Sequence, residues 1–145
     1  MAAAAPRTVL VPVDLGDPTT ARAALDGALR LLPGDGVLHV VSCLPEWGVA
    51  QVSGFFPEGY EKDMLRRFGA ALRDWVGREV PQGVEARAHV LHGTVYDEIL
   101  RAADAVGADV IVMGAHRPEL RDYLLGSNAA RVVRHARQSV YVVRP

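Results

Sequence analysis

The segments Ala108-Asp-Val-Ile-Val-Met-Gly114 and Gly126-Ser-Asn-Ala-Ala-Arg-Val-Val-Arg-His-Ala136 decide the fold of this chain. The first predicts a buried parallel strand over residues 108–113, and the second predicts a helix over residues 128–136. The polar loop between them ends in Gly126-Ser127 at the helix start. Such a strand–loop–helix unit often holds phosphate, because the free N–H groups of the first helical turn and the helix dipole favour an anion.

The rest of the chain alternates apolar, strand-like runs with amphipathic helical patterns. Strands are predicted at residues 8–14, 36–43, 84–91, 108–113 and 139–144, and Pro12 is expected to end the first ladder. Helices are predicted at 18–32 (capped by Asp17), 60–80, 94–107 (opened by a capping box from Thr94 to Asp97) and 128–136. This order predicts an α/β fold: a single-domain, doubly wound, five-stranded parallel sheet with helices on both faces.

Length and composition limit the classes of protein to which the chain can belong. Its 145 residues fit one domain over residues 1–145, with residues 1–6 expected to be a frayed tail. The net charge of −1 gives no nucleic-acid footprint, and no apolar run reaches the ~18 residues of a membrane span. Cys43 is the single cysteine, so no disulfide can form within the chain. We therefore expect a cytoplasmic protein with neither a nucleic-acid nor a membrane partner.

Ligands of doubly wound folds bind outside the carboxyl ends of the strands, where Asp14 and Gly114 are expected. Asp14 is suited to accept ribose hydroxyls, to hold a metal, or to cap the following helix. Gly114 and Gly126 lack a Cβ, which would let a ligand approach the backbone. Ser127 is expected to be the N-cap of the last helix, where its hydroxyl can also donate to phosphate, and Asn128 adds an amide donor.

Other candidates lie in the loop and at the end of the second strand. Arg117 either compensates phosphate charge or is a solvated loop arginine. His116, two residues after Gly114, either contacts a ligand or has no part in binding, and the sequence favours neither alternative. The backbone around His39 and Val40 is expected to border an adenine edge, whereas the His39 side chain is expected to pack in the core. The loop is neither a Walker A motif nor Gly-x-Gly-x-x-Gly, and no catalytic or metal motif is present, so no catalytic or metal-binding residue is predicted.

The chain resembles the universal stress protein family over nearly its whole length, and four segments carry the resemblance. They are the opening strand at 9–14, the second strand at 38–41, the strand at 108–114 and the ending from 124 to 143. The nucleotide-binding branch of that family has the pattern Gly-x2-Gly-x9-Gly-Ser/Thr, of which this chain keeps Gly114 and Gly126-Ser127. It departs at Arg117, which replaces the middle glycine and precedes Pro118, and its loop is one residue shorter.

The resemblance implies a Rossmann-like fold of the adenine nucleotide α-hydrolase-like type. It implies a stress-response regulator that binds ATP, or ADP or AMP, with or without Mg²⁺, and hydrolyses it slowly or phosphorylates itself at most. It also implies a nucleotide-dependent homodimer through the last strand (139–144), or a tetramer; that apolar strand at the chain terminus would be a liability if left unpaired. The implied nucleotide-binding residues are Pro12, Val13, Asp14, Val40, Met113, Gly114, His116, Arg117, Gly126, Ser127, Asn128, Ser139 and Val140.

Two other functions stay open. The first is a nucleotide-free dimer that acts in protein interaction or as a chaperone-like stress protein, for which Arg117 in place of a glycine is the best sequence support. Residues 44–59, a predicted loop with Trp47, Phe55 and Phe56, would then form an apolar partner surface, although they are equally suited to cover the site as a lid. The second is an enzyme of the wider adenine nucleotide α-hydrolase-like group, which would need a substrate-activating motif that this chain does not show.

Overall fold

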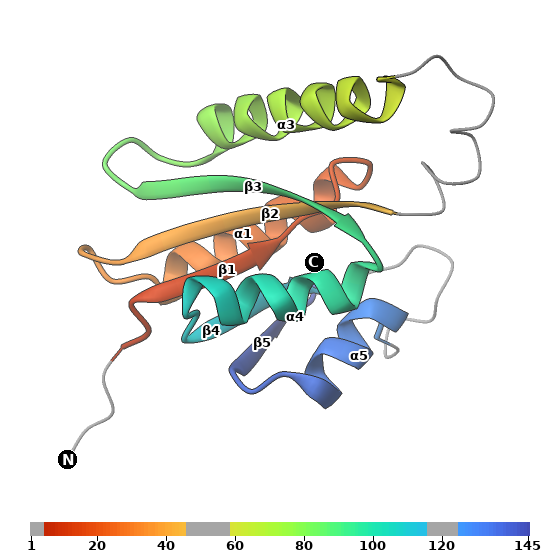
Figure 1. Cartoon of the computed structure of the whole chain (residues 1–145). Coiled ribbons are helices and arrows are strands. Elements are labelled where there is room, and N and C mark those ends of the chain that lie inside the picture. Colours follow the sequence, from red (N-terminus) through yellow and green to blue (C-terminus); the bar gives the residue numbers. More distant parts are fainter. Residues whose placement is uncertain (1–4, 46–58, 116–124) are drawn as a thin grey trace.

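The computed structural model describes residues 5–45, 59–115 and 125–145, which form a parallel sheet and four helices (Figure 1). The sheet has five strands in the order β3-β2-β1-β4-β5, and every neighbouring pair is parallel. This confirms the predicted α/β architecture. The strands are β1 (Thr8–Pro12), β2 (Val37–Pro45), β3 (Glu85–Gly93), β4 (Val110–Gly114) and β5 (Ser139–Val143); the helices are α1 (Pro18–Leu31), α3 (Tyr60–Glu79), α4 (Val95–Val106) and α5 (Ser127–His135).

Helices cover both faces of the sheet, and each face has its own hydrophobic cluster. Val9, Val11 and Val40 point toward α1 and α3, where they pack with Leu25 and Leu72. The alternate positions of the same strands point toward α4 and α5 and form the second cluster. Burial on both faces explains why β1 and β4 read as continuous apolar runs rather than as alternating ones.

Local capping signals in the sequence were reliable in part. The Asp17 carboxylate accepts a hydrogen bond from the Thr20 N–H at 3.3 Å, so α1 begins as predicted. The capping-box prediction at Thr94 was wrong, because Thr94 is the N-cap of α4 but its side chain makes no cap hydrogen bond. The prediction for Ser127 was also wrong by one position: Gly126 is the N-cap of α5 and Ser127 is its first helical residue.

The topology places a crevice at the carboxyl ends of the strands. β1 lies at the centre, with β2 on one side and β4 on the other. The chain continues outward from β2 to β3 on one side of β1, and from β4 to β5 on the other side. A parallel sheet opens a binding crevice at such a switch point, outside the carboxyl ends of its strands. None of the helices in the described ranges has both the length and the apolar character needed to cross a bilayer.

Candidate functional site

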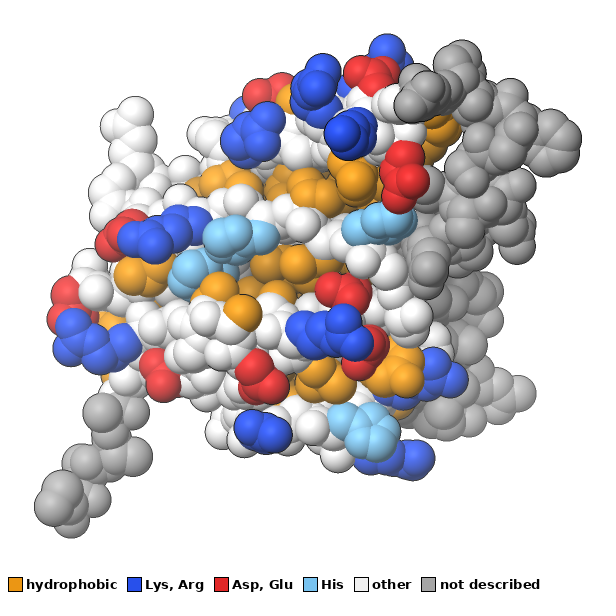
Figure 2. All heavy atoms as spheres, viewed as in Figure 1, with side chains coloured by type: hydrophobic (Ala, Val, Ile, Leu, Met, Phe, Trp, Pro, Cys, Tyr) orange, Lys and Arg blue, Asp and Glu red, His pale blue; other side chains and the backbone are white. Residues whose placement is uncertain are grey.

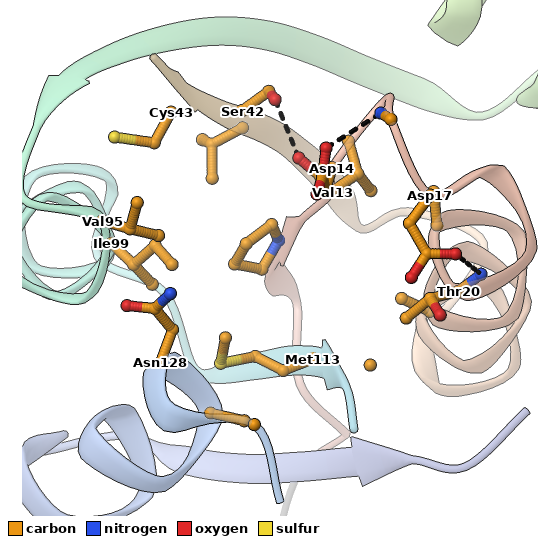
Figure 3. Close-up of a pocket in the computed structure, with 18 of the residues that line it drawn as sticks. Val13, Asp14, Asp17, Thr20, Ser42, Cys43, Val95, Ile99, Met113 and Asn128 are labelled. Atoms are coloured by element: carbon orange, nitrogen blue, oxygen red, sulfur yellow. Dashed lines mark hydrogen bonds between the residues drawn. The ribbon is translucent and has the colours of Figure 1, made fainter. Parts of the chain in front are cut away.

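A cleft of about 810 Å³ opens at the carboxyl ends of β1, β2 and β4. Its walls come from the first turns of α1, α4 and α5, so three helix N-termini converge on one space (Figure 3). This volume is within the range of sites for small molecules. The lining includes Pro12, Val13, Asp14, Asp17, Thr20, Val41, Ser42, Cys43, Leu44, Val95, Ile99, Met113, Gly114, Gly126 and Asn128.

The turn after β1 places a carboxylate in the cleft. Asp14 Oδ1 accepts a hydrogen bond from the Gly16 N–H at 2.8 Å (Figure 3). The Asp14 carbonyl accepts another from the Asp17 N–H at 3.0 Å. These two bonds fix the turn, and the Asp14 side chain remains exposed to solvent. Asp14 and Asp17 are the charged side chains among the lining residues in the described part of the chain.

The end of β1 is tied to β2 by a buried serine. The Val13 N–H donates to the Val41 carbonyl at 2.8 Å, and the Ser42 hydroxyl donates to the Val13 carbonyl, also at 2.8 Å. Ser42 is 3% exposed, so this bond is shielded from water. Both main-chain groups of Val13 are therefore occupied, which holds the adjacent Asp14 at the mouth of the cleft.

Gly114 is explained by packing as well as by its place in the cleft. A Cβ at this position would collide with Thr20 Cγ2 on α1 and would lie 3.4 Å from the Thr20 carbonyl oxygen. The missing side chain thus lets the first turns of α1 approach the end of β4. The sequence predicted close approach of a ligand here; in the structure a neighbouring helix occupies the direction of the Cβ.

The start of α5 forms the opposite wall. Gly126 is buried and adopts φ −63° and ψ 157°, an extended conformation open to any residue, and as the N-cap it has no side chain of its own to cap the helix. Asn128 extends toward Val95 and Ile99 on α4 (Figure 3). Because the N-cap glycine offers no side chain to the first-turn N–H groups of α5, this end of the cleft is suited to an anion.

Cys43 lines the cleft as a protonated thiol. Burial, and then the charge of the nearby Glu98 carboxylate, raise the pKa of the Cys43 thiol to about 11. Its Sγ lies 3.6 Å from the Gly93 carbonyl oxygen at the end of β3. A thiol with this pKa is a poor nucleophile at neutral pH, so the cleft wall is chemically inert at this position.

We expect Cys43 to react with iodoacetamide at pH 8 about 100-fold more slowly than a free cysteine, because so little thiolate is present. Glu98→Gln should accelerate the reaction, since it removes the second cause of the raised pKa. Mass spectrometry of timed samples measures both rates. Alkylation of the wild-type protein at the rate of free cysteine would contradict the description of this thiol.

Three residues implied by the resemblance lie elsewhere. Val40 is fully buried in the cluster with α1 and α3, because β2 runs on to Pro45 and brings residues 41–44 to the cleft instead. Ser139 and Val140 begin β5, where they pair with Val110 and Ile111 at the start of β4. Strands β4 and β5 are parallel, so these two residues lie at the end of the sheet away from the cleft.

The structure brings together Pro12, Val13, Asp14, Met113, Gly114, Gly126 and Asn128 as lining residues. Ser127 is exposed between two of them, at the first position of α5. His116, Arg117 and the aromatic residues of the 44–59 segment lie outside the described residues. Within the described ranges, no three His, Cys, Asp or Glu side chains group as a metal site.

Sequence reasoning missed Thr20, Ser42, Cys43, Val95 and Ile99. The polar pair Ser42-Cys43 at the end of an apolar strand was the one local signal for part of this set. The remaining residues line the cleft because helices α1 and α4 pack over it, which is a tertiary feature without a local sequence mark.

The family model described as the universal stress protein family matches residues 6–144. This chain belongs to the universal stress protein family. It is 32% identical over 140 residues to universal stress protein G of Escherichia coli O157:H7, covering 95% of this chain and 99% of that relative.

Solved structures of this family have the same fold. Protein MJ0577 of Methanocaldococcus jannaschii superposes with a TM-score of 0.81 at 23% identity, covering 98% of both chains. A universal stress protein solved in complex with cAMP gives a TM-score of 0.68 at 24% identity, covering 97% of this chain and 98% of that one. At these identities the likeness shows the shared fold.

Proposed function

We propose that this protein binds an adenine nucleotide, with ATP as the expected ligand, and acts as a stress-response regulator in the cytoplasm. The observation that carries the proposal is the cleft itself: the Asp14 carboxylate and the N-terminus of α5, whose N-cap is a glycine, lie on opposite walls of one ligand-sized space. A carboxylate suits ribose hydroxyls, and a helix N-terminus suits phosphate. The cAMP complex of a protein with this fold supports an adenine nucleotide as the ligand class.

The ribose would lie against Asp14. One oxygen of this carboxylate, Oδ1, already accepts the Gly16 N–H, which fixes the orientation of the side chain. The second oxygen, Oδ2, is the group we assign to the ribose hydroxyls. A carboxylate held by its own turn loses little conformational entropy when a ligand binds, which favours affinity.

The adenine would lie between the apolar side chains of Val13 and Met113 and the end of β2. Val37 and Val41 make main-chain bonds to Arg7 and Val13, the residues that flank β1, so the alternation of a parallel ladder directs the N–H and C=O of Cys43 to the same side. No residue of β1 lies opposite Cys43, because β1 ends at Pro12 and the main chain of Val13 is bound by Val41 and Ser42. We therefore assign the adenine edge to the main chain of Cys43, rather than to Val40.

The phosphates would lie at Gly126, Ser127 and Asn128, where the first-turn N–H groups of α5 point out of the helix. The two carboxylates of the described lining would oppose a triphosphate, and Mg²⁺ bound to the ligand would offset that repulsion. His116 and Arg117 are further proposed contacts from the sequence. Hydrolysis or self-phosphorylation, if either occurs, is expected to be slow.

The proposed regulator is a homodimer that forms through β5. This strand is at the edge of the sheet, and Tyr141 at its centre is 41% exposed. Val133 on the neighbouring α5 is 46% exposed. An apolar edge strand of this kind is usually covered by a partner, and a second copy of the chain offers a matching strand.

A second candidate is a nucleotide-free dimer that binds other proteins, for which the exposed Tyr141 and Val133 are the structural support. Both functions share the dimer, so its detection does not separate them. Native mass spectrometry of the purified protein does: a mass increment of ATP, ADP or AMP per chain supports the proposed function. An empty dimer that gains no mass in excess ATP and Mg²⁺ supports the second.

A further inference from the structure

Two histidines on neighbouring strands form a direct pair. Nδ1 of His39 on β2 lies 2.9 Å from Nε2 of His89 on β3. The ring centroids are 5.1 Å apart and the ring planes differ by 19°. Because the centroid distance is close to the nitrogen–nitrogen distance plus the two ring radii, the rings meet edge to edge, and the hydrogen bond runs along the line that joins them.

The pair lies where imidazole side chains gather over β2 and β3 (Figure 2). His39 is 7% exposed, and the charged groups that act on it are His89, Arg87 and Glu85, all on β3. Arg87 also donates to Glu85 at 2.8 Å. The charged side chains of the adjacent α4 have partners of their own: Arg101 pairs with Asp97 and Glu98, and Asp104 accepts a hydrogen bond from Gln138.

A hydrogen bond between two imidazole nitrogens needs one hydrogen between them. The neutral pair carries two ring hydrogens, and a first added proton can be held on an outer nitrogen with the bond intact. A second added proton places N–H against N–H and sets two cations side by side, next to Arg87. The bond therefore survives at most one positive charge on the two rings.

We propose that His39 and His89 form an acid-sensitive latch that holds the edge strand β3 to β2 and opens when the pair takes up its second proton. Among the described residues β3 is the last strand on its side of the sheet and pairs only with β2, so a side-chain bond between the two strands adds directly to its attachment. The consequence extends along the chain, because β3 leads through Gly93 into α4, whose Val95 and Ile99 line the cleft.

The direction of the pH effect follows from the surroundings of His39. Burial, then His89 and Arg87, lower the pKa of His39 below its ordinary value, while Glu85 raises it to a lesser extent. Between this lowered pKa and about pH 6.5, His39 therefore binds more protons in the unfolded chain than in the folded one. The stabilisation is present above this pH and is lost as the pH falls through the lowered pKa.

The test combines histidine side-chain NMR with hydrogen exchange of the β3 amides between pH 7.5 and 5. The His39 ring should titrate below the ordinary histidine pKa. The β3 amides, corrected for intrinsic exchange, should exchange about tenfold or more faster at pH 5 than at pH 7.5. His89→Gln keeps an acceptor for the His39 ring N–H but takes up no proton, so its β3 exchange should depend less on pH than that of the wild type, the remainder coming from the burial of His39. His135→Gln, which removes an exposed histidine at the end of α5, should match the wild type.

The latch is excluded if both rings titrate independently near the ordinary histidine value. It is also excluded if His89→Gln shows the pH dependence of the wild type. If His89→Gln does not fold, the wild-type protein still tests the latch. Its NMR titration and its β3 exchange each give either the result expected for the latch or the result that excludes it. Both readouts are independent of any nucleotide, so they stand apart from the proposed function.

Discussion

Gly126→Val is expected to weaken ATP binding by about 100-fold or more. Under the proposed function the phosphates approach the N–H groups that follow Gly126, and charge-assisted hydrogen bonds of this kind contribute about 1.5–3 kcal/mol each. A valine side chain on the cleft wall would hold the phosphates away from at least one of them. The backbone itself tolerates the change, because φ −63° and ψ 157° suit any residue. Isothermal titration calorimetry of the variant measures the loss.

The matched control for this variant is Ala130→Val, on an exposed position of the same helix. It introduces the same side chain on α5 away from the cleft lining, and its ATP affinity should equal that of the wild type. Valine is a poorer N-cap than glycine, so Gly126→Val should also lower the free energy of unfolding by about 1 kcal/mol. A loss of this size lowers the melting temperature by a few degrees. If Gly126→Val folds and binds ATP with wild-type affinity, the phosphates do not bind at this end of the cleft.

Gly114→Ala is expected to destabilise the fold by about 1–3 kcal/mol, the usual cost of overpacking. The new methyl group would collide with Thr20 Cγ2, so the Thr20 side chain must rotate or α1 and the end of β4 must move apart. At an ordinary strand position the same change costs little or even stabilises, because alanine restricts the unfolded chain. Urea unfolding of both proteins measures the difference.

The double variant Gly114→Ala/Thr20→Ala separates packing from ligand approach. If close contact of the two side chains is the cause, removing Cγ2 of Thr20 should restore most of the lost stability, with a coupling free energy of about 1 kcal/mol or more. If the losses of unfolding free energy simply add in the double variant, contact with Thr20 is not the reason that position 114 needs a glycine. Both measurements are made without nucleotide, so they do not depend on the proposed function.

The sheet and its helices were predictable because their signals are local. Continuous apolar runs mark strands buried on both faces, and Asp17-Pro18 marks the start of α1 by a hydrogen bond that spans three residues. The capping predictions at Thr94 and Ser127 failed because a capping residue type permits a cap without enforcing one. At α5 the chain enters the helix one residue earlier, and glycine takes the N-cap position.

The site was predictable where it depends on strand ends. Asp14 and Gly114 follow apolar runs directly, so a parallel sheet brings them to one edge. The role of Ser42 depends on how far β2 extends past β1, and the reason for Gly114 depends on how closely α1 approaches β4. These are tertiary distances that no local pattern contains. Ser139 shows the converse case, since the start of a parallel strand must lie opposite the end that forms the cleft.

The central claim is that the cleft binds an adenine nucleotide. Calorimetric titration of the wild-type protein with ATP and Mg²⁺ tests it most directly, with GTP as the control ligand and AMP and cAMP to define how much of the phosphate chain is needed. We expect saturable binding of one adenine nucleotide per chain and much weaker binding of GTP, whose base presents a different edge to the main chain of β2. The absence of both heat and a thermal shift with every adenine nucleotide at about 1 mM, where even a weak site with a millimolar Kd is half filled, would contradict the claim.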